Sequence, residues 1–181
     1  MMFDGAHGEV MGLADASVIT EVRTGAVSGV ATDLLARKDA HHLAVIGAGA
    51  QGRSHLAAMM EVRDIQKVTV YDQRREAAKK YQKEMEEKYK IPVMVCDSVE
   101  EAVKGAEIIC TVTPSKEPYL KAEWITPGAH INAVGAFTPN TREIESSLMA
   151  KAKLYADQVE AMKKESGEYL IPKNEGLFGE E

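Results

Sequence analysis

A glycine-rich motif directly after an apolar run is the feature that most constrains this chain. The segment GAGAQG at residues 47–52 fits the pattern G-x-G-x-x-G, follows an apolar run at 43–46 and opens a helical pattern. The first glycine of such a motif makes a tight turn, the second lets a pyrophosphate approach the backbone, and the third lets helix and strand pack closely. The free N–H groups of the helix N-terminus favour the same anion. The predicted dinucleotide contacts here are Gly47, Gly49, Ala50, Gln51 and Gly52.

An acidic residue follows this motif at the expected distance. Asp72 ends the β-branched run at 67–71 and lies 20 residues after Gly52. A carboxylate at this place accepts hydrogen bonds from the adenine ribose hydroxyls and repels a 2′-phosphate. NAD(H) is therefore the favoured cofactor, whereas Arg74 and Arg75 directly afterwards leave NADP(H) open. A glycine-rich turn without a ligand is the alternative reading.

The rest of the chain alternates between short apolar runs and helical stretches. Six runs read as strands, at residues 43–46, 67–71, 93–95, 107–113, 130–134 and 153–156. The helices expected are at 51–60, 74–89, 98–104, 143–151 and 159–165. Such alternation predicts an α/β fold of the Rossmann type, with a doubly wound, mostly parallel six-stranded sheet and right-handed crossovers. A long helix that begins near Asp15 and ends near Arg37 precedes the first strand.

Three parts are expected along the chain. Residues 1–40 hold an N-terminal extended piece and the linking helix, and residues 41–166 form the NAD(P)-binding Rossmann domain. Residues 167–181 are expected to form a loose C-terminal tail, because glycine and proline interrupt any helical or strand period there.

Charge and composition exclude several classes of partner. The 181 residues carry a formal net charge of −6, which argues against nucleic acid or an anionic membrane surface as the main partner. No apolar run approaches the ~20 residues that a bilayer requires, so no membrane partner is expected. Two cysteines without a CxxC spacing fit a reducing, cytoplasmic setting. Spacings typical of a metal site are absent, so no metal is predicted.

Two further strand ends are candidate cofactor contacts, because ligands of an open parallel sheet lie outside the carboxyl ends of its strands. Thr111, Val112 and Thr113 end one strand, and the two threonine hydroxyls suit ribose and nicotinamide. Val134 and Gly135 follow another strand, where a flat ring can lie against bare backbone. Simple strand termination is the alternative for each group.

No catalytic residue is predicted, although hydride chemistry usually needs a group that moves a proton. His41 and His42 precede the first parallel strand and are expected at the surface. His130 begins a strand at the same wrong edge, and His55 reads as a packing or surface residue of a helix. Cys110 lies within an apolar strand and reads as a core residue rather than a nucleophile.

The order of several motifs resembles that of one family. They are RTGA at 23–26, VIGAGAQG at 45–52, VYDQ at 70–73, TVTPSKEP at 111–118, and PGAHINAVGAFTP at 127–139 with Arg142 and Glu143. In this order they are similar to the ornithine cyclodeaminase/mu-crystallin family. The resemblance covers nearly the whole chain and corresponds to the nucleotide-binding middle portion of a longer family chain.

The resemblance implies an amino-acid or cyclic-imine oxidoreductase that transfers a hydride at the substrate Cα. It places the substrate carboxylate on Arg23, whose planar guanidinium offers two parallel donors, and it places Thr24 beside the cofactor. Phe137 stands where cyclodeaminases carry an acid/base aspartate, which favours imine reduction or amino-acid dehydrogenation. A homodimer is implied for the full-length parent, with a second domain outside this chain. An ornithine cyclodeaminase, which forms proline plus ammonia, and a non-catalytic nucleotide- or ligand-binding module remain as alternatives.

Overall fold

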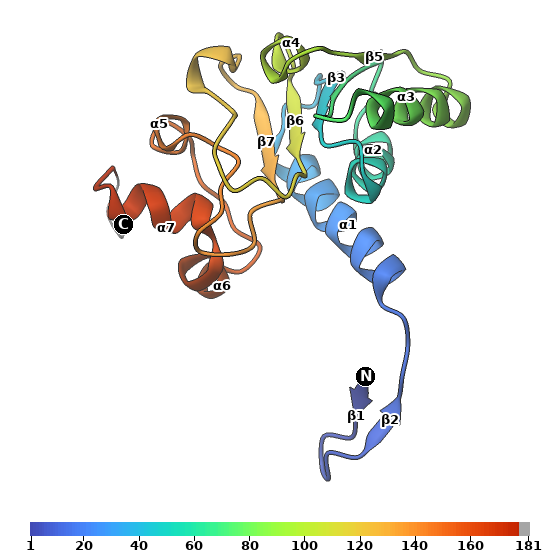
Figure 1. Ribbon diagram of the computed structural model, residues 1–181, viewed down its shortest axis with the longest axis vertical. Coiled ribbons are helices and arrows are strands. Elements are labelled where there is room, and N and C mark those ends of the chain that lie inside the picture. The colour runs from blue at the N-terminus through green and yellow to red at the C-terminus, as the bar shows by residue number, and fades with distance from the viewer. Residues whose placement is uncertain (178–181) are drawn as a thin grey trace.

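A parallel sheet of five strands forms the centre of the computed structural model, which describes residues 1–177 (Figure 1). The strands are β3 (His42–Ile46), β4 (Lys67–Tyr71), β5 (Val93–Val95), β6 (Ile108–Thr111) and β7 (His130–Ala133). Their order across the sheet is β5-β4-β3-β6-β7, and every neighbouring pair is parallel. The chain therefore winds outward in both directions from β3, which creates the switch point where doubly wound sheets bind ligands.

Each face of the sheet has its own hydrophobic core, because successive residues of a strand point to opposite faces. Leu43 and Val45 belong to one core, which also holds residues of α2 (Ala50–Val62) and α3 (Arg75–Tyr89). Ala44 and Ile46 belong to the other core, with α4 (Val99–Val103), α5 (Ser146–Met149) and the loop that contains η1 (Ala122–Trp124). The two cores confirm the doubly wound architecture.

The long helix before the sheet is α1 (Ser17–Leu35), and it packs on α2 through small residues. A Cβ on Gly25 would lie 2.9 Å from the Ser54 carbonyl oxygen, so the two backbones nearly touch. Further along, Ser28 Oγ lies 2.9 Å from Nε2 of the buried His55. This close packing fixes α1 against the helix that follows the glycine motif.

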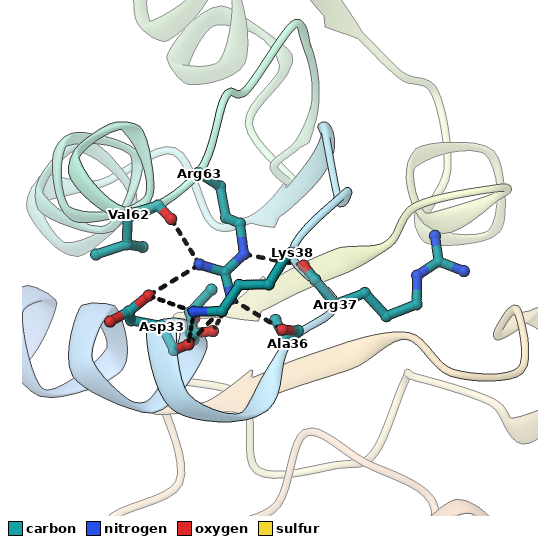
Figure 2. A network of polar contacts seen from close by, with 7 residues as sticks. Asp33, Ala36, Arg37, Lys38, Val62 and Arg63 are labelled. Atoms are coloured by element: carbon teal, nitrogen blue, oxygen red, sulfur yellow. Dashed lines mark hydrogen bonds and ion pairs between the residues drawn. The ribbon is translucent and has the colours of Figure 1, made fainter.

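Arg63, which follows α2, fastens the C-terminal end of α1 (Figure 2). Its buried guanidinium donates to the carbonyl oxygens of Thr32 at 2.7 Å and Ala36 at 2.8 Å, and Nε donates to Arg37 O at 2.9 Å. Nη1 also pairs with the Asp33 carboxylate at 3.1 Å. The last carbonyl groups of a helix lack partners within it. Arg63 supplies those partners and thereby holds α1 at a fixed angle to α2.

The N-terminal piece forms a two-stranded antiparallel hairpin, β1 (Met2–Phe3) and β2 (Val10–Gly12), which projects away from the sheet (Figure 1). None of the helices within residues 1–177 combines the length and the apolar character that crossing a membrane demands.

The prediction of a sixth strand at residues 153–156 is wrong. This segment has no strand partner among residues 1–177, and Leu154 and Tyr155 are exposed. The helix expected at 143–151 is also shorter. Its first residues pair instead with Leu120, whose N–H donates to Glu143 O at 2.9 Å and whose carbonyl accepts from Glu145 N at 3.0 Å. That pairing delays the start of α5 until Ser146.

The described part of the segment expected to be a loose tail is ordered. After α6 (Val159–Glu165), helix α7 (Gly167–Asn174) buries Glu168, Tyr169 and Pro172. A Cβ on Gly167 would overlap the Thr141 carbonyl oxygen. The glycine that interrupts the sequence pattern thus permits close docking of α7. Residues 178–181 of the predicted tail lie outside the described residues.

His42, expected at the surface, is buried. It begins the central strand, and its ring nitrogens lie 3.1 Å from Gly105 O and 3.1 Å from Thr69 Oγ1. Burial is the main cause that lowers the pKa of His42, so this ring is held neutral in the interior.

Candidate functional site

The glycine motif forms the turn between β3 and α2. Gly47 has a φ of 111°, a left-handed conformation that favours glycine, and its N–H donates to Tyr71 O at 2.9 Å. A Cβ on Gly52 would overlap the Gly47 carbonyl oxygen, so only glycine lets α2 begin this close to β3. Gly49 differs, because it is exposed and a Cβ there would meet no described atom within 4 Å. The space in front of the second glycine is therefore open to a ligand.

The N-terminus of α2 faces this space without a side-chain cap. Its N-cap is Gly49, and the helix continues to Val62. The first N–H groups of an uncapped helix carry partial positive charge and lack partners within the helix. Such an end suits a phosphate or pyrophosphate.

Arg53 holds the glycine loop in place through hydrogen bonds to its backbone. Its Nη1 donates to the carbonyl oxygens of Ala48 at 2.5 Å and Gly49 at 2.9 Å. Nε of the same guanidinium donates to Glu84 of α3 at 2.8 Å, which fixes the arginine in place. Tyr81 adds a hydrogen bond from its hydroxyl to Gly52 O at 3.2 Å. The backbone carbonyl groups of the loop are thus held by hydrogen bonds from Arg53 and Tyr81.

Asp72 lies beside the glycine loop, at the end of β4. Its Oδ2 accepts from Ala48 N at 2.9 Å and its Oδ1 accepts from Arg74 N at 2.9 Å, with 14% of the side chain exposed. Each carboxylate oxygen has a second lone pair, so both can still accept from hydroxyl groups of a ligand. The Arg74 side chain is exposed, with Nε 3.7 Å from Asp72 Oδ1, and Arg75 pairs with Asp97.

The strand ends of the predicted site lie in one row. Asp72 follows β4, the glycine loop follows β3, Val112 and Thr113 follow β6, and Val134 follows β7. The order β4-β3-β6-β7 therefore sets out these groups side by side along the carboxyl edge of the sheet. The loop also touches the next strand end, since a Cβ on Gly47 would lie 2.8 Å from Val112 O.

Thr111 is placed differently from its neighbours. It is fully buried, and its hydroxyl has no hydrogen-bond partner among the described residues. Val112 and Thr113 are only half-buried. Contact of the Thr111 hydroxyl with a cofactor stays a prediction that this burial does not favour.

A buried carboxylate joins two of these strand ends, at a residue for which the sequence predicts only the start of a helix. Glu143 is fully buried, and its Oε1 accepts from Thr113 N at 2.7 Å, Thr113 Oγ1 at 2.6 Å and the Tyr119 hydroxyl at 2.6 Å. Its Oε2 accepts from Gly135 N at 2.8 Å. Burial and the nearby charge of Glu143 raise the pKa of Tyr119, which keeps this phenol a donor.

A second buried carboxylate supports the first. Glu168 of α7 accepts from Glu143 N at 2.5 Å and from Ile144 N at 3.3 Å. Burial raises the pKa of Glu168 to about 7, and the nearby charge of Glu143 adds to the shift. The helix α7 thus reaches the strand-end network through its first turn.

The titration of Glu168 predicts a stability that falls as the pH rises. Its unfolded pKa is near 4.5 and its folded pKa is about 7, so the folded chain binds more protons between these values. The free energy of unfolding should therefore decrease by roughly 1–3 kcal/mol between about pH 5 and pH 8 through this group. Urea unfolding across this range should show a flatter slope for Glu168→Gln. The exposed Glu165→Gln serves as the control. Equal slopes for wild type and Glu168→Gln would contradict the assignment.

Arg23 and Thr24 lie in the N-terminal half of α1. Arg23 is exposed, and the Thr24 hydroxyl donates to Thr20 O at 2.7 Å. The next residue, Gly25, packs on the backbone of Ser54 in the second turn of α2. The α1–α2 packing thus ties this part of α1 to the helix that begins at the glycine loop.

As far as the structure describes the chain, the row of strand ends includes no cysteine or histidine. Cys110 is fully buried, and burial raises the pKa of its thiol to about 12, so its expected role as a core residue is confirmed. Burial lowers the pKa of His55 and of His130. No group of three or more His, Cys, Asp or Glu suited to a metal occurs among residues 1–177.

Comparison with known proteins gives a consistent result. Residues 1–180 match the family described as "Ornithine cyclodeaminase/mu-crystallin family". The chain is 43% identical to the ketimine reductase mu-crystallin of Mus musculus, over 94% of this chain and 53% of that protein. It is 40% identical to a Delta(1)-pyrroline-2-carboxylate reductase of Bacillus cereus, over 98% of this chain and 55% of that protein.

Solved structures agree with these relatives. The Delta(1)-pyrroline-2-carboxylate reductase of Thermococcus litoralis, in complex with NADH and L-proline, matches with a TM-score of 0.92 and 41% identity, over 97% of this chain and 55% of that chain. An archaeal alanine dehydrogenase dimer with bound NAD matches with a TM-score of 0.89 and 37% identity, over 98% of this chain and 54% of that chain. The chain thus spans about half the length of the relatives that it matches.

Proposed function

Because this chain belongs to the ornithine cyclodeaminase/mu-crystallin family, we propose that it forms the NAD(H)-binding part of an oxidoreductase acting on amino acids or their imines. One observation carries the proposal. The open space in front of Gly49 lies at the uncapped N-terminus of α2, with the Asp72 carboxylate beside the same loop. An anion-binding helix end next to an acceptor for hydroxyls matches the chemistry of a pyrophosphate joined to a ribose.

The relatives narrow the reaction class. Three of the relatives are named as reductases of imines. They are the ketimine reductase, the Delta(1)-pyrroline-2-carboxylate reductase and, at 27% identity, the iminosuccinate reductase of Paracoccus denitrificans. Three of the solved structures hold NADH with L-proline, NAD, or NAD+. We therefore favour imine reduction, with the nicotinamide supplying the hydride when it is bound.

The chain's own residues divide the work of holding this cofactor. Gly49 and the first N–H groups of α2 would bind the pyrophosphate, and Asp72 would accept from the adenine ribose. The nicotinamide half would then lie along the ends of β6 and β7. The proposed cofactor contacts are Thr24, Gly47, Gly49, Ala50, Gln51, Gly52, Asp72, Val112, Thr113, Val134 and Gly135.

The charge of Asp72 supports NAD(H) over NADP(H). Its carboxylate lies next to the glycine loop, so a 2′-phosphate on the ribose would be repelled. Arg74 is close by, but its side chain is 81% exposed and its charge is screened by solvent.

Arg23 and Phe137 bear on the substrate. The exposed guanidinium of Arg23 is available to bind a carboxylate through two parallel donors. Phe137 follows β7 and is 77% exposed, and a phenyl ring cannot transfer a proton. We therefore place a small imine or amino acid at this end of the site and favour reduction over ornithine cyclodeamination. For the full-length parent we propose a homodimer, as in the alanine dehydrogenase structure.

The substitution Asp72→Ala tests the proposed cofactor site. Loss of the ribose acceptor should weaken NADH binding by about 10- to 100-fold, because hydrogen bonds to a charged group are among the stronger ones. Calorimetric titrations with NADH and NADPH would measure this, and wild type should bind NADH more tightly. Asp64→Ala is the matched control, because Asp64 is an exposed aspartate that precedes β4 at the opposite edge of the sheet. Equal NADH affinity for wild type and Asp72→Ala would contradict the assignment.

A further inference from the structure

The strongest unexplained feature of the strand-end row is the Glu143 carboxylate. It is fully buried, and its two oxygens accept hydrogen bonds from four donors on Thr113, Tyr119 and Gly135. Burying a carboxylate is costly unless hydrogen bonds replace its hydration. Four donors at 2.6–2.8 Å supply that replacement.

The pattern of donors requires a carboxylate rather than an amide. The backbone N–H of Thr113 points at Oε1, and the backbone N–H of Gly135 points at Oε2. A backbone N–H cannot become an acceptor. Glutamine at position 143 would satisfy one of these two N–H groups and would turn its own NH₂ group toward the other. Only an acceptor at both atoms joins the two strand ends.

The two strand ends are packed against each other as well as bonded to Glu143. A Cβ on Gly135 would overlap the Thr113 carbonyl oxygen and would lie 2.6 Å from Glu143 Cδ. Glu168 in turn accepts from the backbone N–H of Glu143 and fixes the position from which the Glu143 side chain starts. The segments after β6 and β7 are therefore joined to each other, both by direct packing and through the Glu143 carboxylate.

We propose that Glu143 is a positioning residue for the nicotinamide half of the dinucleotide, holding the backbone of Thr113 and Gly135 in the arrangement that receives it. The inference rests on the proposed function. It follows from the strand order, because Asp72 and the glycine loop at β4 and β3 take the adenosine and pyrophosphate. The remaining half of the ligand then reaches β6 and β7, which are the strands that Glu143 joins. Among the described residues, no hydrogen bond joins the Glu143 side chain to the glycine loop or to Asp72.

A comparison of two ligands tests this inference. ADP-ribose shares the adenosine, the pyrophosphate and the second ribose of NADH and lacks the nicotinamide ring. For Glu143→Gln, NADH affinity should fall by about tenfold, because one buried N–H loses its acceptor, while ADP-ribose affinity stays within about twofold of wild type. Both affinities are measured by calorimetric titration of the 181-residue chain. The ratio of the two affinities is the readout, since a general loss of structure would weaken both ligands alike.

Two more variants make the outcome decisive. Glu117→Gln is the matched control, because Glu117 is an exposed glutamate in the loop after β6, and it should change neither affinity. Tyr119→Phe removes one donor from Oε1 and leaves both backbone bonds, so a selective NADH loss of about threefold is expected. This milder variant decides the question if Glu143→Gln fails to fold.

Each further result has a defined meaning. Equal weakening of NADH and ADP-ribose in the folded variants would assign Glu143 a structural role only and overturn the inference. Unchanged affinities in the variants would overturn the inference as well. The proposed function would stand in that case, because wild type would still bind both ligands. Wild type that binds neither ligand would overturn the proposed function and the inference with it.

Discussion

Alanine in place of Gly52 is expected to abolish measurable NADH binding and to lower the free energy of unfolding by about 3 kcal/mol. The added Cβ would overlap the Gly47 carbonyl oxygen and would lie 3.2 Å from Val45 Cγ1. The start of α2 would have to move away from β3, and with it the N–H groups proposed to bind the pyrophosphate. Urea unfolding and calorimetric titration with NADH measure the two effects.

Gly49→Ala is the matched control, because the two glycines belong to one motif and differ in surroundings. A Cβ on Gly49 meets open space, so the free energy of unfolding should stay within about 1 kcal/mol of wild type. NADH affinity should still fall by at least about tenfold, because the methyl group would occupy the space proposed for the pyrophosphate. Wild-type NADH affinity in Gly52→Ala, or in Gly49→Ala, would contradict the proposed role of this loop.

Alanine in place of Gly135 should have a comparable effect at the other half of the row. The Cβ would overlap the Thr113 carbonyl oxygen and would press on the Glu143 carboxylate, so the ends of β6 and β7 would separate. A loss of about 3 kcal/mol in the free energy of unfolding is expected from overpacking and from the weakened buried hydrogen bonds. Urea unfolding gives this value directly.

The control for Gly135→Ala is Gly5→Ala in the N-terminal hairpin. A Cβ on Gly5 meets no described atom within 4 Å, and its φ lies outside the left-handed region. Its unfolding free energy should match that of wild type within about 0.5 kcal/mol. Wild-type stability for Gly135→Ala would show that the strand ends yield easily, contrary to the packing described above.

The sequence predicts the glycine turn and the acidic residue at position 72, because each prediction depends only on a short stretch of chain. A tight turn, an uncapped helix start and an acid after the next strand each follow from a short stretch of chain. The parallel sheet followed from the alternation of strands and helices in the same way. The strand predicted at residues 153–156 is wrong because three apolar or aromatic side chains suggest a strand, whereas a strand also needs a neighbouring strand to pair with. That neighbour depends on the whole fold.

Glu143 shows what a single sequence does not reveal. It follows Arg142 and opens a polar stretch, which is typical of an exposed helix start. Its burial depends on Thr113 and Gly135, which lie 30 and 8 residues away along the chain. The same holds for α7, whose first turn is ordered by contact with residues near 143 rather than by its own period.

Mapping NADH onto the isotope-labelled chain by nuclear magnetic resonance tests the proposed cofactor site most directly. The largest saturable shifts of backbone amide signals should occur at residues 47–52, at Asp72, and at the ends of β6 and β7, with Asp64 unaffected. The apolar groove between α1 and α2, lined in part by Val30 and Ala58, should show no such shifts. Shifts confined to that groove, or the absence of saturable shifts anywhere, would contradict a dinucleotide site at the carboxyl edge of this sheet.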